Sequence, residues 1–461
     1  DGARMAAELS QALQFRTVAS REEAFAAEFR AHNARLAALY PVLHSLFPPQ
    51  EFHEQSLLFT IPGQDASLRP VLFISHTDVV PAREEERWTR PPFAGEVVDG
   101  KVWGRGSCDN KGHTVTLLHA VERLLTTTAV TTGASSPWRP QRTVYLAFGH
   151  DEELSGRRGA FAMFTHLKQM HGEDSLDAIF DEGVPVLLPG FLPGLNKTAA
   201  LVCLAEKGQV LVRLDAVGDG GHASGPPPDG GPVIAMAKAL AKLHSNGFPA
   251  AIRAPSAYML DAIAPHMPPV LRLLLSCRRL RIVGRLISYV YSNFMGGSPF
   301  VQTTQAFTTV NGGVGAYELA KEANATMNVR ILPGETVDST FQRIQRLLAE
   351  FPNVTATRIA PERDREPSPV SFATADSIGW VAVNKALKST FGEDIVVTPG
   401  LMVARTDSAH YVPLAPTRIY RVSYFEASMK TVTRLHNYDE YITVDDLVRM
   451  TAAYAGVLQQ L

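Results

Sequence analysis

Residues 71–78 read VLFISHTD, an apolar run of strand-forming residues that ends in a histidine and an aspartate. A second run of this kind, Thr143–Gly149 (TVYLAFG), is followed directly by the acidic tetrapeptide HDEE of residues 150–153. Short apolar runs rich in β-branched and aromatic residues are typical of strands buried on both faces of a sheet. Helical spacing of apolar residues predicts helices over Lys111–Leu125 and Gly156–His171. This alternation predicts an α/β fold whose largely parallel sheet is covered by helices.

A different pattern interrupts this alternation. Gln209–Val217 alternates like a half-exposed strand, and Pro232–His244 has the apolar spacing of an amphipathic helix. Two more strands and a helix are predicted further on, over Thr303–Val310, Ala323–Ile331 and Val337–Glu350. The pattern indicates a small α+β domain inserted into the larger α/β domain.

The domain boundaries follow from these two patterns. The α/β pattern resumes after the Pro- and charge-rich stretch Pro361–Pro369, with helices predicted over Asp376–Phe391 and Thr443–Leu458. We therefore expect the larger domain in two parts, residues 1–206 and 361–461, with the inserted domain over residues 207–360. A chain of 461 residues is long enough for two or three domains.

Composition excludes some classes of protein. The formal net charge is −2, which gives no reason to expect nucleic acid as a partner. The three cysteines, Cys108, Cys203 and Cys277, form no CxxC pair, so neither a disulfide framework nor a thiolate zinc site is indicated. Any metal ion must therefore be held by His, Asp and Glu.

Two weak signals in the sequence bear on the subcellular location of the protein. The chain begins at Asp1 instead of Met, so we expect it to be processed or trimmed. Three glycosylation sequons begin at Asn196, Asn324 and Asn353, and such acceptors matter only on the secretory route. A vacuolar, lysosomal or extracellular location is therefore favoured over a cytoplasmic one.

One segment of the inserted domain fits neither pattern. An extra helical segment is expected over residues 256–294, and its part 267–294 is leucine-rich and carries five arginines. Each arginine costs about 2.5–3.5 kcal/mol at the centre of a membrane-spanning helix, which argues against a span. Two alternatives for this segment stay open: it is an amphipathic helical pair packed on the inserted domain, or it is a surface that contacts lipid or a hydrophobic substrate.

Carboxylates and imidazoles gather at strand ends or in the loops that follow them. The motifs are HTD at 76–78, GRGSCDNK at 104–111, HDEE at 150–153, DEG at 181–183 and RLHNYDE at 434–440. In an open α/β sheet, ligands bind outside the carboxyl ends of the strands. Each motif alone is weak, but together these oxygen and nitrogen donors suit zinc. No GxxxxGK[ST] or GxGxxG sequence supports a nucleotide site instead.

The order HTDVVP, WGRGSCDNKG, GHDEE, DEG, GHAS and LHNYDE resembles the dizinc aminoacylase and carboxypeptidase family. It is most similar to the branch of carboxypeptidase S and the N-fatty-acyl-amino-acid hydrolases, and the likeness covers nearly the whole chain. The resemblance implies a dizinc catalytic domain with an inserted lid and dimerisation domain, and a homodimer. It also implies hydrolysis of an amide bond beside a free carboxylate, in N-acyl amino acids, including fatty-acyl ones, or in short peptides.

The resemblance also assigns the metal ligands. His76 and Glu182 would bind one zinc ion, Glu153 and His436 would bind the other, and Asp109 would bridge both. Two Zn²⁺ per chain, three carboxylates and a bridging hydroxide would bring the site to neutral charge. A metal-bridging water would then be the nucleophile, because two close zinc ions lower its pKa and polarise the scissile carbonyl.

Further roles are implied around the metal ligands. Asp78 would hold the imidazole of His76 in the required tautomer, and Glu152 would be the general base. His222, in the GHAS motif, would stabilise the oxyanion in a partner subunit's site, and Arg330 would bind the substrate carboxylate. By chemistry alone, Asp181 could serve as a ligand as well as its neighbour Glu182, and this alternative stays open.

Three positions depart from the family pattern. Ala316-Tyr317-Glu318 stands where the branch has an asparagine, and Ala409 stands where TDS is often followed by arginine. Asn437 replaces the usual glycine after His436, a change that asparagine tolerates because it accepts left-handed backbone geometry. A catalytically silent dimeric binding protein is the alternative function, although an intact Glu152 and a complete ligand set argue against it. A serine hydrolase is excluded because the chain has no GxSxG sequence.

Overall fold

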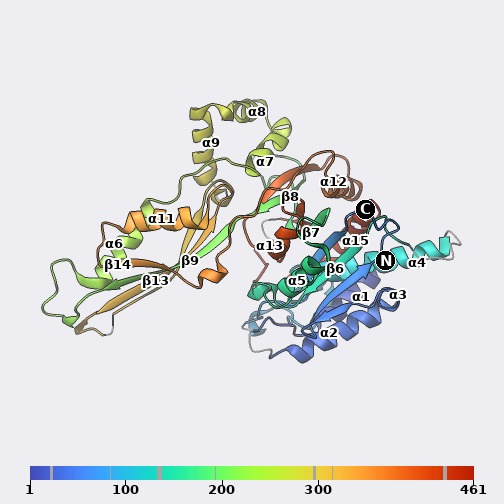
Figure 1. Ribbon diagram of the computed structural model, residues 1–461, viewed down its shortest axis with the longest axis horizontal. Coiled ribbons are helices and arrows are strands. Elements are labelled where there is room, and N and C mark those ends of the chain that lie inside the picture. The colour runs from blue at the N-terminus through green and yellow to red at the C-terminus, as the bar shows by residue number, and fades with distance from the viewer. Residues whose placement is uncertain are drawn as a thin grey trace. The chain divides into compact units, whose positions relative to one another are not determined.

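The computed structural model describes residues 1–20, 24–83, 85–131, 138–192, 194–293, 297–313, 315–428 and 433–461. The chain forms two compact units (Figure 1). The first unit contains Asp1–Leu204, Ala262–Pro268 and Ser371–Leu461, and the second contains Ala205–Asp261 and Pro269–Val370. The Pro-rich stretch after residue 360 thus belongs to the second unit, because Arg365 forms an antiparallel bridge with Gln209.

The first unit combines helices with one large and one small sheet. Its helices are α1 (Gly2–Leu13), α2 (Ala26–Leu39), α3 (Pro41–Leu46), α4 (Lys111–Thr131), α5 (Ala160–His171), α12 (Ile378–Phe391), α13 (Ser408–Tyr411) and α15 (Val444–Leu458). The large sheet contains β1 (Gln50–Phe52), β2 (Ser56–Ile61), β3 (Val71–His76), β6 (Val144–Gly149), β7 (Ala178–Leu187), β8 (Ala199–Glu206), β15 (Val396–Met402) and β16 (Ile419–Ala427). The small sheet contains β4 (Val97–Val98), β5 (Lys101–Trp103) and β17 (Tyr441–Thr443).

The large sheet has the strand order β1-β2-β6-β3-β7-β16-β8-β15. Its central strands β6, β3, β7 and β16 are parallel, whereas β1, β2 and β8 pair antiparallel with their neighbours. Because β6, β3 and β7 run in the same direction, the residues at their carboxyl ends lie along one edge of the sheet. The predicted α/β class with a mostly parallel sheet is confirmed.

Helices cover both faces of this sheet. On one face, Met163 and Leu167 of α5 pack with Leu72 of β3 and Ala147 of β6 in a buried cluster. On the other face, α1, α4, α12 and α15 contact one another, and α4, α12 and α15 contact the strands. The central strands are therefore buried on both faces, which explains why their sequences are continuously apolar.

One strand is longer than its sequence suggests. Asp181, Glu182 and Gly183 lie inside β7, so the expectation that they follow the strand is wrong. The strand continues because β16 pairs beside it in parallel, as far as Ala427 opposite Leu187. Gly183 allows this close pairing, since a Cβ there would lie 2.4 Å from the backbone carbonyl carbon of Arg421.

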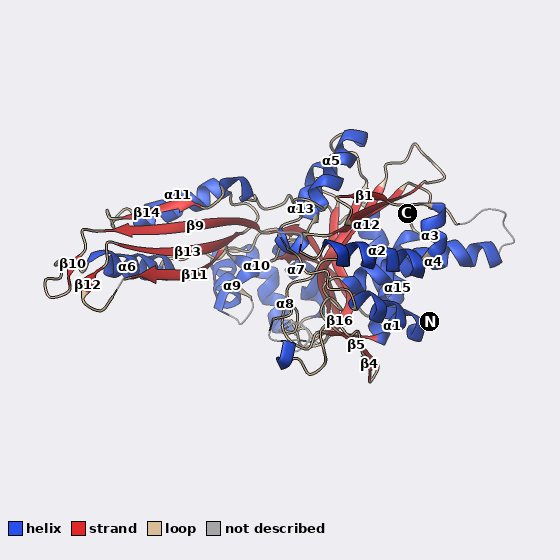
Figure 2. Cartoon of the chain, turned by 90° about the horizontal axis from the view of Figure 1, so that it is seen from below, coloured by secondary structure: helices blue, strands red, loops and turns tan. Residues whose placement is uncertain are grey.

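The second unit is built on an antiparallel sheet with the order β11-β13-β9-β14. Its strands are β9 (Gly208–Val217), β10 (Gly221–His222), β11 (Thr304–Gly312), β12 (Glu318–Leu319), β13 (Glu322–Ile331) and β14 (Val354–Arg358). Its helices are α6 (Gly231–Ser245), α7 (Ser256–Ile263), α8 (Pro269–Ser276), α9 (Arg281–Asn293), α10 (Ser298–Val301) and α11 (Val337–Leu348). Figure 2 shows the strands β14, β9, β13 and β11 side by side.

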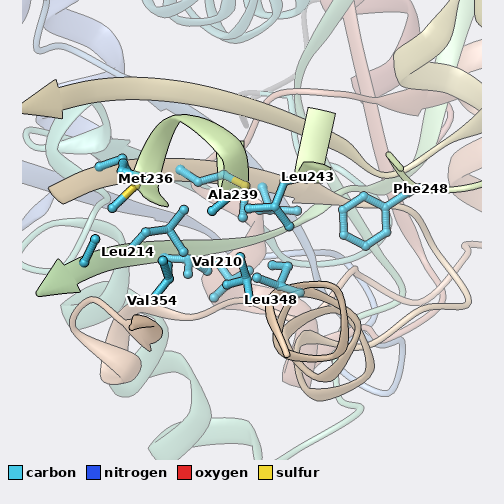
Figure 3. Packing of buried hydrophobic residues seen from close by; sticks show 14 of the residues in the cluster. Val210, Leu214, Met236, Ala239, Leu243, Phe248, Leu348 and Val354 are labelled. Atoms are coloured by element: carbon cyan, nitrogen blue, oxygen red, sulfur yellow. The ribbon is translucent and has the colours of Figure 1, made fainter. Parts of the chain in front are cut away.

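The core of the second unit lies between this sheet and two helices. Alternate residues of β9, including Val210 and Leu214, are buried against Met236 and Leu243 of α6 and Leu348 of α11 (Figure 3). The period-two burial of β9 matches the alternation of its sequence. The predicted α+β character of the inserted domain therefore has a direct structural basis.

The arginine-rich segment forms the helices α8 and α9, so the helical pair is present. Phe294, the end of the predicted segment, lies outside the described residues. Among the residues that the structure describes, no helix is long and apolar enough to cross a membrane.

Candidate metal centre

The first group of candidate ligands contains His76, Asp109 and Glu182. His76 is the last residue of β3 and is buried. Its Nε2 lies 3.2 Å from Asp109 Oδ1 and 3.5 Å from Glu182 Oε1. Asp109 comes from the turn before α4, and Glu182 comes from β7, so three separate elements meet at this point.

The second group contains Asp109 again, with Glu153 and His436. His436 Nε2 lies 3.0 Å from Asp109 Oδ2 and 3.3 Å from Glu153 Oε1. Asp109 therefore presents one carboxylate oxygen to each group, which is the geometry that a bridging ligand needs. All five residues expected as metal ligands lie in these two groups, and Asp181 lies in neither.

Asp78 connects both groups through hydrogen bonds. Its carboxylate accepts the backbone N–H groups of Glu152, at 3.2 Å, and Glu153, at 3.1 Å. His76 Nδ1 lies 3.1 Å from the carbonyl oxygen of Asp78 and 3.3 Å from its Oδ1. A carbonyl oxygen only accepts, so Nδ1 carries a proton, and in the neutral ring that a metal ion would require, the lone pair of Nε2 would face the first group.

Asp181 and Glu182 point in different directions, as neighbours on a strand do. Asp181 Oδ2 accepts the backbone N–H of Ser408 at 2.9 Å, and its Oδ1 accepts the N–H of Glu182 at 2.8 Å. Asp181 is thus used to fix the chain around it. Glu182 is the carboxylate that faces His76.

The sequence predicts no role for Glu440, yet this residue holds the loop that carries Asp109. Its Oε1 accepts the backbone N–H groups of Cys108, at 2.8 Å, and Asp109, at 3.1 Å. Its Oε2 accepts the N–H of Gly106, at 3.2 Å, and an ion-pair bond from Arg105, at 2.7 Å. The only sequence signal was its place at the end of the RLHNYDE motif.

The loop that carries Glu152 and Glu153 is held from a second side. Arg405 and the Nε2 atom of His410 contact the carbonyl oxygen of Ser155 at 3.1 Å and 2.8 Å. These residues flank the TDS sequence, whose aspartate, Asp407, is fully buried and close to Gly156. The residues on either side of the TDS sequence therefore help to hold the turn that carries Glu152 and Glu153.

Burial and neighbouring charges shift the titration of the site. Burial raises the pKa of Glu182 to about 7, although His76 opposes this. Burial also raises the pKa of Glu152 well above its usual range, and the nearby carboxylates of Asp407 and Glu182 add to this. Asp109 and Glu153 raise the pKa of His436 to about 10. Burial thus opposes ionisation of the two glutamates, whereas the carboxylates of Asp109 and Glu153 favour a positive charge at His436.

The donor set fits divalent metal ions. Two buried atoms, His76 Nε2 and Glu153 Oε1, make no hydrogen bond, although each faces its own ligand group. A buried polar atom without a hydrogen bond is costly unless something else satisfies it. Imidazole nitrogens and carboxylate oxygens are ligands that zinc accepts in catalytic sites.

His222 and Arg330 belong to the second unit. His222 is exposed, lies opposite Glu318 in the β10–β12 pair, and its Nδ1 accepts the backbone N–H of Ser224 at 3.2 Å. Arg330 lies near the end of β13. Burial lowers the pKa of Lys207 to about 7, the guanidinium of Arg330 adds to this shift, and the carboxylate of Glu335 opposes it.

We expected left-handed backbone geometry at Asn437, but the structure has it one residue earlier, at His436. His436 itself has a positive φ of 60°, and Asn437 is not among the residues with positive φ. The strain therefore falls on the proposed ligand, whose ring is turned towards Asp109 and Glu153.

Residues 72–460 match Peptidase family M20/M25/M40. The chain belongs to this family. The probable carboxypeptidase S-like 2 of Dictyostelium discoideum is 32% identical over 462 residues, which cover 99% of this chain and 84% of that protein. The N-fatty-acyl-amino acid synthase/hydrolase PM20D1.1 of Danio rerio is 32% identical over 405 residues, which cover 88% of this chain and 75% of that protein.

The fold agrees with that of a solved member of the M20 family. The metallo-carboxypeptidase Sso-CP2 from Sulfolobus solfataricus superimposes with a TM-score of 0.68 at 16% identity, covering 99% of this chain and 98% of that one. Membership of the M20 family makes this chain a metallohydrolase, and it supports metal-dependent hydrolysis of the amide bonds of peptides or N-acyl amino acids.

Proposed function

We propose that this M20 chain is a dizinc enzyme that hydrolyses an amide bond beside a free carboxylate. The observation that carries the proposal is the pair of ligand groups that share Asp109, with Glu152 next to Glu153 in the same turn. His76 and Glu182 would hold one zinc ion, Glu153 and His436 the other, and Asp109 both. When bound, the ions would acidify a shared water molecule and polarise the scissile carbonyl.

The chain's own residues would move the proton. Glu152 would take a proton from the attacking water and return it to the departing amine. A base of this kind works best when its pKa is above the usual carboxylate range, and burial raises the pKa of Glu152 in that direction. Asp78 would keep Glu152 in place, because it accepts the Glu152 backbone N–H at 3.2 Å.

The second unit would supply the substrate contacts. Arg330 offers a guanidinium that can bind a carboxylate through two parallel hydrogen bonds. Because His222 Nδ1 accepts a hydrogen bond from the Ser224 backbone, the neutral ring carries its proton on Nε2. That N–H can stabilise a developing oxyanion, and we propose that it does so in the site of a partner subunit of a homodimer.

The names of two relatives support the proposed substrate class. One is named a carboxypeptidase and another an N-fatty-acyl-amino acid synthase/hydrolase, so both peptides and N-acyl amino acids carry the required free carboxylate. We propose N-acyl amino acids with long apolar acyl groups as the preferred substrates, and short apolar peptides as the second candidates. We propose no nucleic-acid partner for this function, in keeping with the net charge of −2.

A secretory location is proposed with this function. Two sequon asparagines, Asn196 and Asn353, are exposed and thus accessible to glycosylation. Treatment of the protein from its native source with an endoglycosidase should reduce its apparent mass, and an unchanged mass would argue against the secretory route.

A metal-analysis and activity experiment tests the proposed enzyme. Purified protein should contain about two zinc ions per chain and should cleave N-acyl amino acids, and chelation should abolish turnover reversibly. Bound zinc without turnover of any N-acyl amino acid or dipeptide would favour the alternative, a silent binding protein on the same fold.

A further inference from the structure

Large apolar side chains are exposed over the helices α8 and α9 of the second unit. Six of them, each between 55% and 82% exposed, define what we call the hairpin patch: Val270, Leu273, Leu280, Ile282, Leu286 and Tyr289. Single exposed apolar residues are ordinary, but a run of them on neighbouring helices marks a surface that contacts something else. The α8–α9 pair is helical, as expected, but it does not bury this apolar surface.

The orientation of α9 accounts for the patch. Ile282, Leu286 and Tyr289 follow one another at helical spacing and therefore lie on one face, which is the solvent face. The opposite face packs inward: Ser288 is buried, Ile287 and Tyr291 are half-buried, and a Cβ on Gly284 would lie 2.4 Å from the carbonyl oxygen of Arg278. The helix therefore carries large apolar residues on its solvent face as well as on its packed face, whereas the usual surface helix has one apolar face, which points inward.

The stretch of sequence that carries the patch is rich in arginine and has no acidic residue. No aspartate or glutamate occurs between Ala262 and Tyr317, whereas this stretch contains five arginines, at positions 272, 278, 279, 281 and 285. Arg278 is paired with Asp261, which precedes the stretch, while Arg279 and Arg285 are exposed. Arginines beside exposed apolar side chains complement an anionic lipid surface, where both phosphates and acyl chains are available.

We propose that the hairpin patch docks the chain on the surface of a membrane that contains anionic phospholipid. The apolar side chains would enter the boundary between headgroups and acyl chains, and the arginines would bind phosphates. A second copy of the chain fits this surface less well, because a symmetric contact would bring the arginines of both copies together. The proposal concerns binding alone and does not depend on the proposed hydrolase activity.

Vesicle sedimentation tests the docking. The full chain is mixed with vesicles of phosphatidylcholine alone, or of phosphatidylcholine with phosphatidylserine. We expect binding to the phosphatidylserine vesicles and weaker binding as NaCl is raised, because salt screens the arginines. The double substitution Ile282→Glu/Leu286→Glu should weaken binding at least about tenfold, since it places charges in the apolar boundary. The substitution Val310→Glu is the matched control, because Val310 is 60% exposed on β11 of the same unit, and it should bind like the wild type.

A second variant separates charge from apolar contact. Arg279→Gln/Arg285→Gln should weaken binding to phosphatidylserine vesicles by about fivefold per arginine, and should leave binding to phosphatidylcholine unchanged. Thermal melting followed by circular dichroism checks that every variant is folded. Failure of the wild type to bind phosphatidylserine vesicles, or unchanged binding of the folded Ile282→Glu/Leu286→Glu variant, would overturn the proposal. A wild type that self-associates through the patch and binds no vesicles would identify an interface between copies instead.

Discussion

The carboxylate of Glu440 accepts the backbone N–H of Asp109 at 3.1 Å. Asp109 is the residue common to both ligand groups, and Glu440 follows His436 by four positions in the same segment. One buried carboxylate thus ties together a loop before α4 and the segment before β17, and each of these brings a proposed ligand to the second group. The position of the shared ligand therefore depends on a residue that contacts no metal.

Glu440→Gln should lower metal affinity by about 10–100-fold, the usual effect of removing a group that orients a ligand. Both carboxylate oxygens of Glu440 accept backbone hydrogen bonds. In the variant, the amide nitrogen of Gln replaces one of these oxygens and cannot accept a hydrogen bond from an N–H group. Isothermal titration calorimetry, with zinc added to protein whose metal has been removed by a chelator, measures the zinc affinity. Glu8→Gln is the matched control, because Glu8 is also a buried carboxylate of the first unit, paired with Arg4 and His119. Equal zinc affinity for the two variants would contradict the role of Glu440.

Asp109→Ala should remove both metal ions, because this residue alone belongs to both groups. His436→Ala, by contrast, should weaken one ion only. Since metal binding to the folded chain adds to its stability, zinc should raise the Tm of the wild type but not that of Asp109→Ala. Metal content by mass spectrometry and melting with and without zinc check both statements. Two retained ions in Asp109→Ala would exclude it as the shared ligand.

The sequence predicts the elements of the fold that have local signals. Apolar continuity located β3 and β6, and helical spacing located α4, whose start at Lys111 agrees with the structure. The helical spacing predicts that α5 starts at Gly156, but the helix begins at Ala160. The reason is local: Asp151 accepts the N–H groups of Arg158 and Gly159, both at 2.8 Å, and holds this stretch as a loop.

The sequence pattern does not predict contacts between residues that lie far apart in the chain. The extension of β7 through Glu182 depends on pairing with β16, more than two hundred residues later. The helices α1 and α2 and the strand β16 were not predicted, and the role of Glu440 depends on a loop 331 positions away. The candidate ligands came instead from motifs in the order of a known family, and the structure brings those five residues together.

Glu152→Gln should lower kcat by at least about 10²-fold, the lower end for loss of a positioned base. Bound zinc should stay near the wild-type level, because Glu152 belongs to neither ligand group. Steady-state rates and metal content, measured on the same preparation, test the two statements together. A variant with wild-type activity would show that another residue is the base.

His222 provides a test of subunit assembly. Chains with His222→Ala and chains with Glu152→Gln should each be nearly inactive. After subunit exchange in a mixture, one site of each heterodimer would combine an intact Glu152 with an intact His222 from the other chain. Activity should then recover to about one quarter of the wild-type level for random exchange, with one working site in half of the dimers. A mixture with proven exchange and no recovery would place His222 in its own subunit's site or outside catalysis.

The dependence of kcat/KM on the length of the acyl group tests the proposed preference for fatty-acyl amino acids. If the site prefers fatty-acyl amino acids, kcat/KM should rise at least about tenfold from N-acetyl to N-stearoyl substrates, because each buried methylene contributes about 0.8 kcal/mol. Arg330 would bind the carboxylate at the opposite end of every substrate in the series. Arg330→Lys should therefore lower kcat/KM equally at all acyl lengths. The reason is that an ammonium group does not reproduce the paired hydrogen bonds of a guanidinium. Measuring the series below the critical micelle concentration, with wild type and Arg330→Lys in parallel, separates the two effects. A flat or falling series would exclude the fatty-acyl preference while leaving the metal chemistry untouched, and an Arg330→Lys effect confined to one acyl length would show that the arginine does not bind the common carboxylate.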